Sequence, residues 1–140
     1  MVDSTENRYV PRIARISERA EPRGSSFTVP MAAIRLLGTI RDIHFAEIHP
    51  GCVRGNHYHA QHHEVLCIRF FDRWSLHWKP AAGGRTETES FAGAGLILVE
   101  VEPLIAHAIL NDGERDLHVI GLSNKEFNPQ EPDSLSLQIV

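Results

Sequence analysis

Cysteine and long hydrophobic runs are both scarce in this sequence of 140 residues, and each shortage excludes a class of protein. The two cysteines, Cys52 and Cys67, are too few for a disulfide framework, so we expect a reducing, cytoplasmic environment. The longest aliphatic run, Leu96 to Val99, is far shorter than the roughly 20 apolar residues that a membrane helix needs. The first residues lack the cationic start and apolar centre of a signal peptide. We therefore expect neither a membrane span nor secretion.

Positive charge is scarce as well. Lysine and arginine total 14, against 18 aspartates and glutamates, which gives a formal net charge of −4. A protein that binds nucleic acid without sequence preference needs a basic surface to neutralise phosphates, and this composition does not supply one. We therefore expect a small-molecule ligand and no nucleic acid.

Turn-forming residues, by contrast, recur along the whole chain. Ten glycines and eight prolines separate short runs of Val, Ile, Leu, Phe and Trp whose lengths suit strands. This pattern predicts an all-β fold, either a sandwich or a barrel-like double sheet such as the jelly roll. Residues 12–20, where Ile13 and Ile16 are three apart, suggest one short helix. The predicted strands are Phe27–Val29, Ile34–Leu37, Ile43–Ile48, Asn56–His59, Glu64–Phe71, Trp74–Trp78, Thr86–Phe91, Leu96–Val101, Ala106–Leu110 and Leu117–Leu122.

Six of the nine histidines lie within the 20 residues from His44 to His63. Because side chains alternate along a strand, His57 and His59 point to one face and Tyr58 to the other. Glu64 opens the next predicted strand and can bring a carboxylate back to the same point. Two imidazoles and a carboxylate, joined by one more ligand, suit a divalent metal, with zinc as the first choice and iron, nickel or manganese as alternatives.

The fourth ligand is expected from a distant strand, and His77, His107 and His118 are the candidates. His107 fits best, because a proline-marked turn leads into the apolar run around it and a buried imidazole needs a polar partner. A hydrogen bond within the core is the alternative partner. We interpret His44 and His49 as ordinary strand and turn residues.

The spacing of these residues resembles the two motifs of the cupin superfamily. The first motif is Gly51-x5-His57-x-His59-x4-Glu64, and the second is Pro103-x3-His107-x3-Asn111. The resemblance implies a double-stranded β-helix, a jelly-roll barrel, with His57, His59, Glu64 and His107 as metal ligands. The second motif departs from the pattern at one position, because Ile105 stands where a glycine is expected.

Two stretches resemble a narrower group, the C-terminal cupin domain of bifunctional capsular-polysaccharide enzymes that epimerise and then reduce UDP-2-acetamido-2,6-dideoxy-hexuloses. These stretches are residues 50–59 and 123–133. Residues 21–24 are similar to a turn found early in sugar-nucleotide cupins, including dTDP-sugar 3,5-epimerases and 3,4-ketoisomerases. Since the reductase domain is not part of this chain, the resemblance implies that a reduction would need a separate protein.

On this resemblance, residues 1–20 are expected to form an N-terminal arm, its first ten residues loosely docked or disordered, and residues 21–140 a single cupin domain. A homodimer is implied as well. The alternation of Leu135, Leu137 and Ile139 predicts an edge strand that two copies could exchange.

The implied activity is epimerisation next to the ketone of a 4-keto-hexose nucleotide, in the biosynthesis of a surface polysaccharide. Arg54, Arg23 and Asn56 are the residues expected to bind the substrate, with guanidinium groups suited to a diphosphate. The sequence does not identify the residue that carries the proton. Candidates are His62, His63 and Tyr58, with Asp72 and His77 on neighbouring strands.

Three other functions use the same fold or the same ligands. They are a sugar 3,4-ketoisomerase, a metal cupin that binds a small ligand without turnover, and an iron-dependent dioxygenase with three histidines and one carboxylate. Fold alone does not separate them. The metal and the product of the reaction do.

Overall fold

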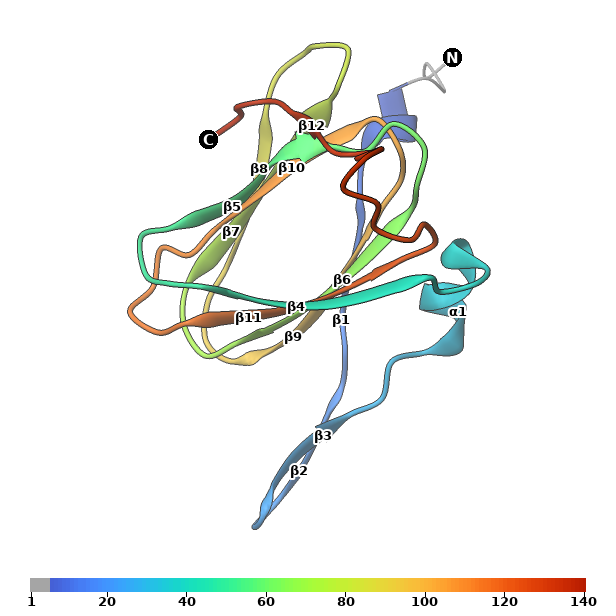
Figure 1. Cartoon of the computed structure of the whole chain (residues 1–140). Coiled ribbons are helices and arrows are strands. Elements are labelled where there is room, and N and C mark those ends of the chain that lie inside the picture. The colour runs from blue at the N-terminus through green and yellow to red at the C-terminus, as the bar shows by residue number, and fades with distance from the viewer. Residues whose placement is uncertain (1–5) are drawn as a thin grey trace.

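The computed structural model describes residues 6–140, and almost all of its regular structure is β-strand. Two five-stranded antiparallel sheets face each other and form a barrel (Figure 1). One sheet has the order β1 (Arg12–Arg15), β9 (Gly95–Val101), β6 (Glu64–Phe70), β11 (Leu117–Ser123) and β4 (Asp42–Ile48). The other has the order β12 (Leu135–Ser136), β5 (Val53–Tyr58), β10 (Ile105–Leu110), β7 (Trp74–Pro80) and β8 (Glu87–Phe91). The predicted all-β fold with two sheets is confirmed.

Among the described residues, three short helical segments and one hairpin lie outside these sheets. The hairpin of β2 (Glu18–Glu21) and β3 (Gly24–Phe27) extends away from the barrel (Figure 1). The helical segments are η1 (Glu6–Tyr9), α1 (Met31–Ile34) and η2 (Arg35–Leu37). No helix within residues 6–140 combines the length and the hydrophobicity needed to cross a membrane.

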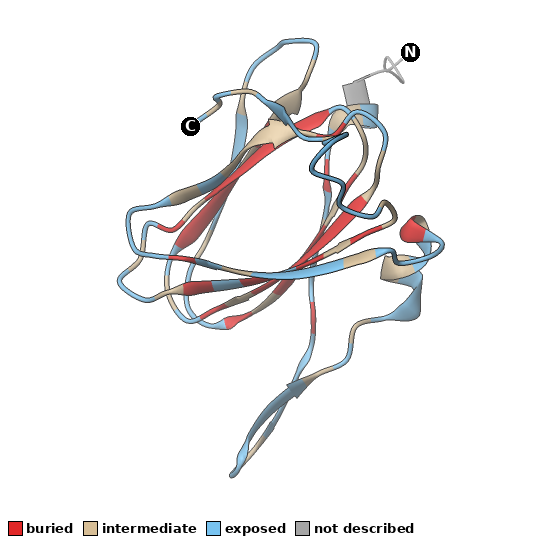
Figure 2. Cartoon of the chain, viewed as in Figure 1, coloured by how far each residue is buried: buried red, intermediate tan, exposed pale blue. Residues whose placement is uncertain are grey.

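Alternation of side chains along the strands builds the core between the sheets. On β6, Leu66, Ile68 and Phe70 point inward and join the main core, and Glu64 is on the same alternation. The outward Val65 and Cys67 are also buried, because a second cluster that includes Leu37 covers that face. Figure 2 shows the resulting concentration of buried residues on the central strands and their absence from β2 and β3.

Three local predictions were wrong. The strand predicted at Phe27–Val29 overlaps β3 only at Phe27, where β3 ends. The helix suggested for residues 12–20 is instead β1 and β2, and β1 pairs with β9 from Arg12 opposite Glu100 to Arg15 opposite Ile97. This part of the expected arm therefore pairs with the barrel. The predicted strand Ile34–Leu37 is helical, since Gly38 N–H bonds to the Arg35 carbonyl at 3.0 Å and the turn buries Leu37. Residues 1–5 of the expected arm lie outside the described residues.

The C-terminal segment turns back onto the same chain. β12 pairs with β5, and beyond it the backbone N–H of Leu137 donates to the Asn56 carbonyl at 2.8 Å. The predicted edge strand is thus shorter than residues 135–139, and in the single chain it lies against β5. The homodimer stays a prediction.

Candidate metal centre

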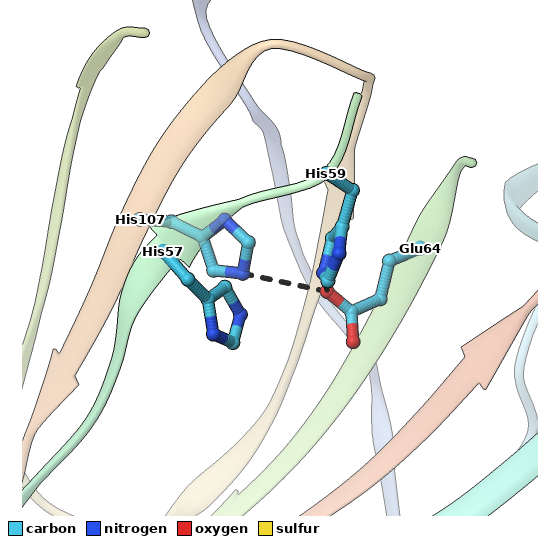
Figure 3. A group of neighbouring side chains, drawn as sticks. All are labelled: His57, His59, Glu64 and His107. Atoms are coloured by element: carbon cyan, nitrogen blue, oxygen red, sulfur yellow. Dashed lines mark hydrogen bonds and ion pairs between the residues drawn. The ribbon is translucent and has the colours of Figure 1, made fainter. Parts of the chain in front are cut away.

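Four side chains of the first and second motifs come together inside the barrel. His57 lies on β5, His59 directly follows that strand, Glu64 opens β6 and His107 lies on β10 (Figure 3). Each offers one ligand atom, and all four atoms lie within 4.8 Å of one another. The structure thus brings together the four residues expected to hold a metal.

A β-bulge in β5 sets the register of two of these residues. Ala108 pairs with Gly55, but the preceding residue of β10, His107, pairs with His57, so that Asn56 is an extra residue. In a regular ladder Asn56 would face His107, and His57 would point to the other side of the sheet. Gly55 makes the bulge possible: its φ is +101°, and a Cβ there would lie 2.6 Å from the His107 carbonyl oxygen.

Glu64 is a buried carboxylate at the centre of the group. Its Oε2 lies 3.1 Å from His59 Nε2 and 3.4 Å from His107 Nε2, the contact drawn in Figure 3. Burial alone would raise the pKa of Glu64, but hydrogen bonds and charge interactions with His107 and His59 outweigh it and hold the pKa well below its usual range. Glu64 is therefore an anion at neutral pH.

The hydrogen bonds of His59 and His107 leave both Nε2 atoms suited to a metal. His59 Nδ1 lies 2.9 Å from the Asp133 carbonyl oxygen, and His107 Nδ1 lies 3.1 Å from the Ile105 carbonyl oxygen. A carbonyl can only accept, so each Nδ1 donates its hydrogen to the backbone and each Nε2 is the atom directed at Glu64. A divalent cation could take the place of the proton that each Nε2 shares with the carboxylate. The donor set therefore fits a metal ion.

His57 completes the group as a neutral ligand. Burial, and after it the neighbouring His107 and His59, lower its pKa to about 4. Its ring centroid lies 4.8 Å from that of His59 and 4.9 Å from that of His107. For His59, burial lowers the pKa, but the hydrogen bond and the charge of Glu64 outweigh it, and the net shift is upward.

Two cavities meet at this group. The first has a volume of about 420 Å³, and apolar residues of β4, β6, β10 and β11 line it together with Arg54. The second has a volume of about 380 Å³ and extends from His59 and His62 to the segment of residues 125–134. Both volumes suit part of a small organic ligand.

The three residues expected to bind substrate have different positions. Arg54 is exposed and lines the first cavity, where a guanidinium can meet an anionic ligand. Arg23 lies at the tip of the β2–β3 hairpin, pairs with Glu21 at 2.8 Å and lines neither of these two cavities. Asn56 holds the C-terminal segment: its Oδ1 accepts from Ile139 N–H at 2.9 Å. The structure therefore brings Arg54 to the site, but not Arg23 or Asn56.

Of the three expected proton carriers, only His62 lines either cavity. Its Nδ1 lies 2.8 Å from Asp133 Oδ2, and its ring stacks on that of His59 with centroids 3.8 Å apart. His63 Nδ1 is buried, and Tyr58 lies on β5 opposite Leu135.

The two carriers considered on neighbouring strands are also committed elsewhere. Asp72 caps a turn, accepting from the backbone N–H groups of Arg73 and Glu114. His77 lies between Ser75 and Thr88, with ring nitrogens 2.9 Å and 3.0 Å from their hydroxyl oxygens.

Sequence reasoning missed His44, which lies on β4 and lines both cavities. It also missed Asp133, whose carboxylate accepts from the backbone N–H groups of Ala60, Gln61 and His62 and so orders the loop between His59 and Glu64. Burial opposes ionisation of Asp133, but the hydrogen bonds from Gln61 and His62 outweigh it and lower its pKa.

Proteins of known structure share this fold, and three of them are a capsular polysaccharide assembling protein, a dTDP sugar isomerase and a 3,4-ketoisomerase. Capsular polysaccharide assembling protein CapF from Staphylococcus aureus has 20% identity and a TM-score of 0.65, over 90% of this chain and 33% of CapF. The chain thus spans 33% of the length of CapF. A dTDP sugar isomerase from Desulfovibrio desulfuricans has 10% identity and a TM-score of 0.75, over 91% of this chain and 83% of that protein.

A variant of the 3,4-ketoisomerase QdtA from Thermoanaerobacterium thermosaccharolyticum, solved with TDP-4-keto-6-deoxyglucose, has 13% identity and a TM-score of 0.68. That match covers 91% of this chain and 87% of QdtA. No curated protein sequence matches the chain.

These likenesses concern the fold, and with the two facing sheets they confirm the expected cupin-type jelly roll. A match in sequence goes further, because it extends over residues 31–135 and takes in both motifs of the metal group. The matched family is described as the polysaccharide biosynthesis C-terminal domain, and the chain belongs to it.

Proposed function

We propose that the protein is a metal-dependent sugar-nucleotide epimerase that acts on the carbon next to the ketone of a 4-keto-hexose nucleotide. The observation that carries this proposal is the group of His57, His59, Glu64 and His107, three of which line a cavity of about 420 Å³. The family of the chain and the sugar isomerases of similar fold support a nucleotide sugar as substrate.

Each part of the site has a role in this reaction. The four ligands would hold one divalent metal, with zinc as the first choice and iron, nickel or manganese as alternatives. When bound, such a cation supplies Lewis acidity, which favours the negative charge that develops on a keto oxygen. Arg54 would bind the diphosphate at the rim of the first cavity. The apolar residues on the cavity wall, Ile48, Leu66, Ile109 and Val119, would exclude water from the reacting carbon.

The decisive experiment follows one proton. Metal-reconstituted protein is mixed with 4-keto UDP- and dTDP-sugars in D₂O, and NMR follows the hydrogen on the carbon next to the ketone. We expect exchange for deuterium together with a new epimer. A panel in which no sugar exchanges would reject the epimerase.

Metal content gives an independent test of the site. We expect purified protein to contain a stoichiometric divalent metal and the His57→Ala variant to contain little, because a three-ligand site is incomplete. His49→Ala is the matched control, since His49 is exposed, pairs with Asp116 and is not part of the group. Equal metal contents in wild type and His57→Ala would contradict the four-ligand site. Iron with oxygen consumption would favour the dioxygenase instead.

A sugar 3,4-ketoisomerase is the second candidate, and one observation favours it. The match with QdtA covers 87% of that protein, whereas the match with CapF covers 33% of CapF. The same NMR experiment separates the two functions, because a ketoisomerase moves the carbonyl to the neighbouring carbon and an epimerase leaves it in place.

If the protein is an epimerase, a separate reductase would act on the ketone that it has epimerised.

A further inference from the structure

Three residues line both cavities, among those the structure describes: His44, His57 and Glu64. His57 and Glu64 belong to the metal group, so His44 is the titratable side chain that faces both cavities from outside that group. A ligand that occupies either cavity next to the metal group therefore comes near the His44 ring.

Asp42 fixes the tautomer of His44. Its Oδ2 lies 3.1 Å from His44 Nδ1, and an ionised carboxylate can only accept, so Nδ1 carries the hydrogen. The lone pair is then on Nε2. This atom lies 4.0 Å from Glu64 Oε1, which is too long for a hydrogen bond, so Nε2 stays free to take a proton.

The wall of the barrel has a place for this ring. His44 on β4 pairs with Gly121 on β11, and a Cβ at residue 121 would overlap with the His44 imidazole. Asp42 is two residues earlier on the same face of β4 and pairs with Ser123. The glycine therefore lets the imidazole lie against the sheet, beside the metal group.

We propose that His44 is the catalytic base of the reaction and that Asp42 is its positioning residue, a role that rests on the proposed function. The C–H bond next to the ketone breaks, its electron pair stays with the substrate as an enolate, and the proton forms an N–H bond at His44 Nε2. Water returns a proton to the opposite face of the carbon, and His44 releases its own proton to water. A histidine whose Nδ1 is held by a carboxylate presents Nε2 as the atom that takes the proton, which is the arrangement of a general base.

His62 is the rival, because it too has an aspartate partner. Its ring stacks on His59 with centroids 3.8 Å apart, and it lines the second cavity but not the first. His44 lines both cavities, so a substrate in either one can reach it, and the geometry favours His44 as the base.

The test compares three glutamine variants in the D₂O exchange experiment. His44→Gln is expected to slow exchange by about 10²–10⁴-fold, the usual contribution of a general base, with metal content and substrate affinity as in the wild type. His62→Gln is expected to keep most of the exchange rate. His49→Gln is the matched control, because His49 Nδ1 lies 2.9 Å from Asp116 on the exposed surface. Rapid exchange in His44→Gln, or loss of exchange in His62→Gln alone, would overturn the assignment.

Two further measurements keep the proposal testable if His44→Gln folds poorly. Added imidazole should restore exchange in His44→Ala but leave His49→Gln unchanged. The ¹⁵N spectrum of the histidine rings, which needs no activity, should show the proton on Nδ1 of His44 and a loss of that preference in Asp42→Asn. A wild type with the proton on Nε2 would reject the Asp42–His44 pair. If the wild-type protein catalyses deuterium exchange on none of the sugars, that result would instead reject the proposed function, and the role of His44 with it.

Discussion

Glu64 and Asp72 are two carboxylates whose pKa values are lowered for different reasons. Glu64 is buried, and its histidine partners outweigh the cost of burial. Asp72 lies at the turn between β6 and β7, and hydrogen bonds from the backbone N–H groups of Glu114 and Arg73 lower its pKa. Glu64 offers an anionic ligand to a metal, whereas Asp72 connects the β6–β7 turn to the loop before β11 by a hydrogen bond.

The role of Asp72 gives a pH dependence with a defined sign. Because its pKa is lower in the folded chain than in the unfolded one, its contribution to stability is present above about pH 4–5 and is lost as pH falls through the folded pKa. Asp72→Asn should therefore lower the Tm near pH 7 and have progressively less effect as the solution becomes more acidic. Asp112→Asn, on the facing loop, is the control. A difference in Tm that does not depend on pH would show that the charge of Asp72 is not responsible.

At the scale of single residues, the sequence predicted the metal group well and the rest of the site poorly. His57, His59, Glu64 and His107 were predictable from strand alternation and ligand chemistry. His44 was not, because Ile43 and Phe45 also alternate, and apolar alternation would normally place those two inside. In the structure they are 57% and 78% exposed, and His44 faces the cavities instead.

At the scale of elements, strand positions were largely predictable and their register was not. Runs such as Glu64–Phe71 and Leu96–Val101 differ from β6 and β9 by one residue at one end. The helix of residues 35–37 was missed because Ile34, Leu36 and Leu37 are apolar enough for a strand, while local hydrogen bonds at Ala33 and Gly38 decide for a turn. The bulge in β5 depends on how two distant strands meet, which a single run of residues does not reveal.

The bulge itself gives a prediction with a matched control. Gly55→Ala should lower the free energy of unfolding by at least about 1–3 kcal/mol, because φ is +101° and the new Cβ would clash with the His107 carbonyl. It should also reduce metal content, since His57 and His107 would be displaced. Gly51→Ala tests strain alone: φ there is +74°, and a Cβ would meet nothing within 4 Å. Urea denaturation and metal analysis measure both effects. If the two variants behave alike, the close approach of β5 and β10 has no special role.

At the scale of the whole molecule, the C-terminal segment closes one side of the metal centre. The Asp133 carbonyl accepts from His59, and the Asp133 side chain holds the loop that precedes Glu64. Further along, Asn56 binds the backbone of Ile139 and Val140. The same segment lines the second cavity and so lies between the metal group and solvent.

Asn56→Gly should release the last two residues of this segment and leave the Asp133 contacts and the metal group in place. Glycine keeps the positive φ of +54° but removes the amide that accepts from Ile139 and Val140. We expect faster hydrogen exchange at both residues and a loss of about 1 kcal/mol of stability, with metal content and substrate affinity unchanged. Gln138→Ala, which removes a hydrogen bond within the segment, is the control. A large fall in substrate affinity would support the earlier expectation that Asn56 binds substrate.

The extra residue in β5 also shows how the length of this strand can change. Ala108 pairs with Gly55 and the preceding residue, His107, pairs with His57, so Asn56 has the position of a one-residue insertion in the ladder. A β5 strand without Asn56 would still place His57 opposite His107. It would keep the metal ligands and lose the amide that holds residues 139 and 140. A one-residue change in length could therefore separate two properties, metal binding and closure by the C-terminal segment, without altering any ligand.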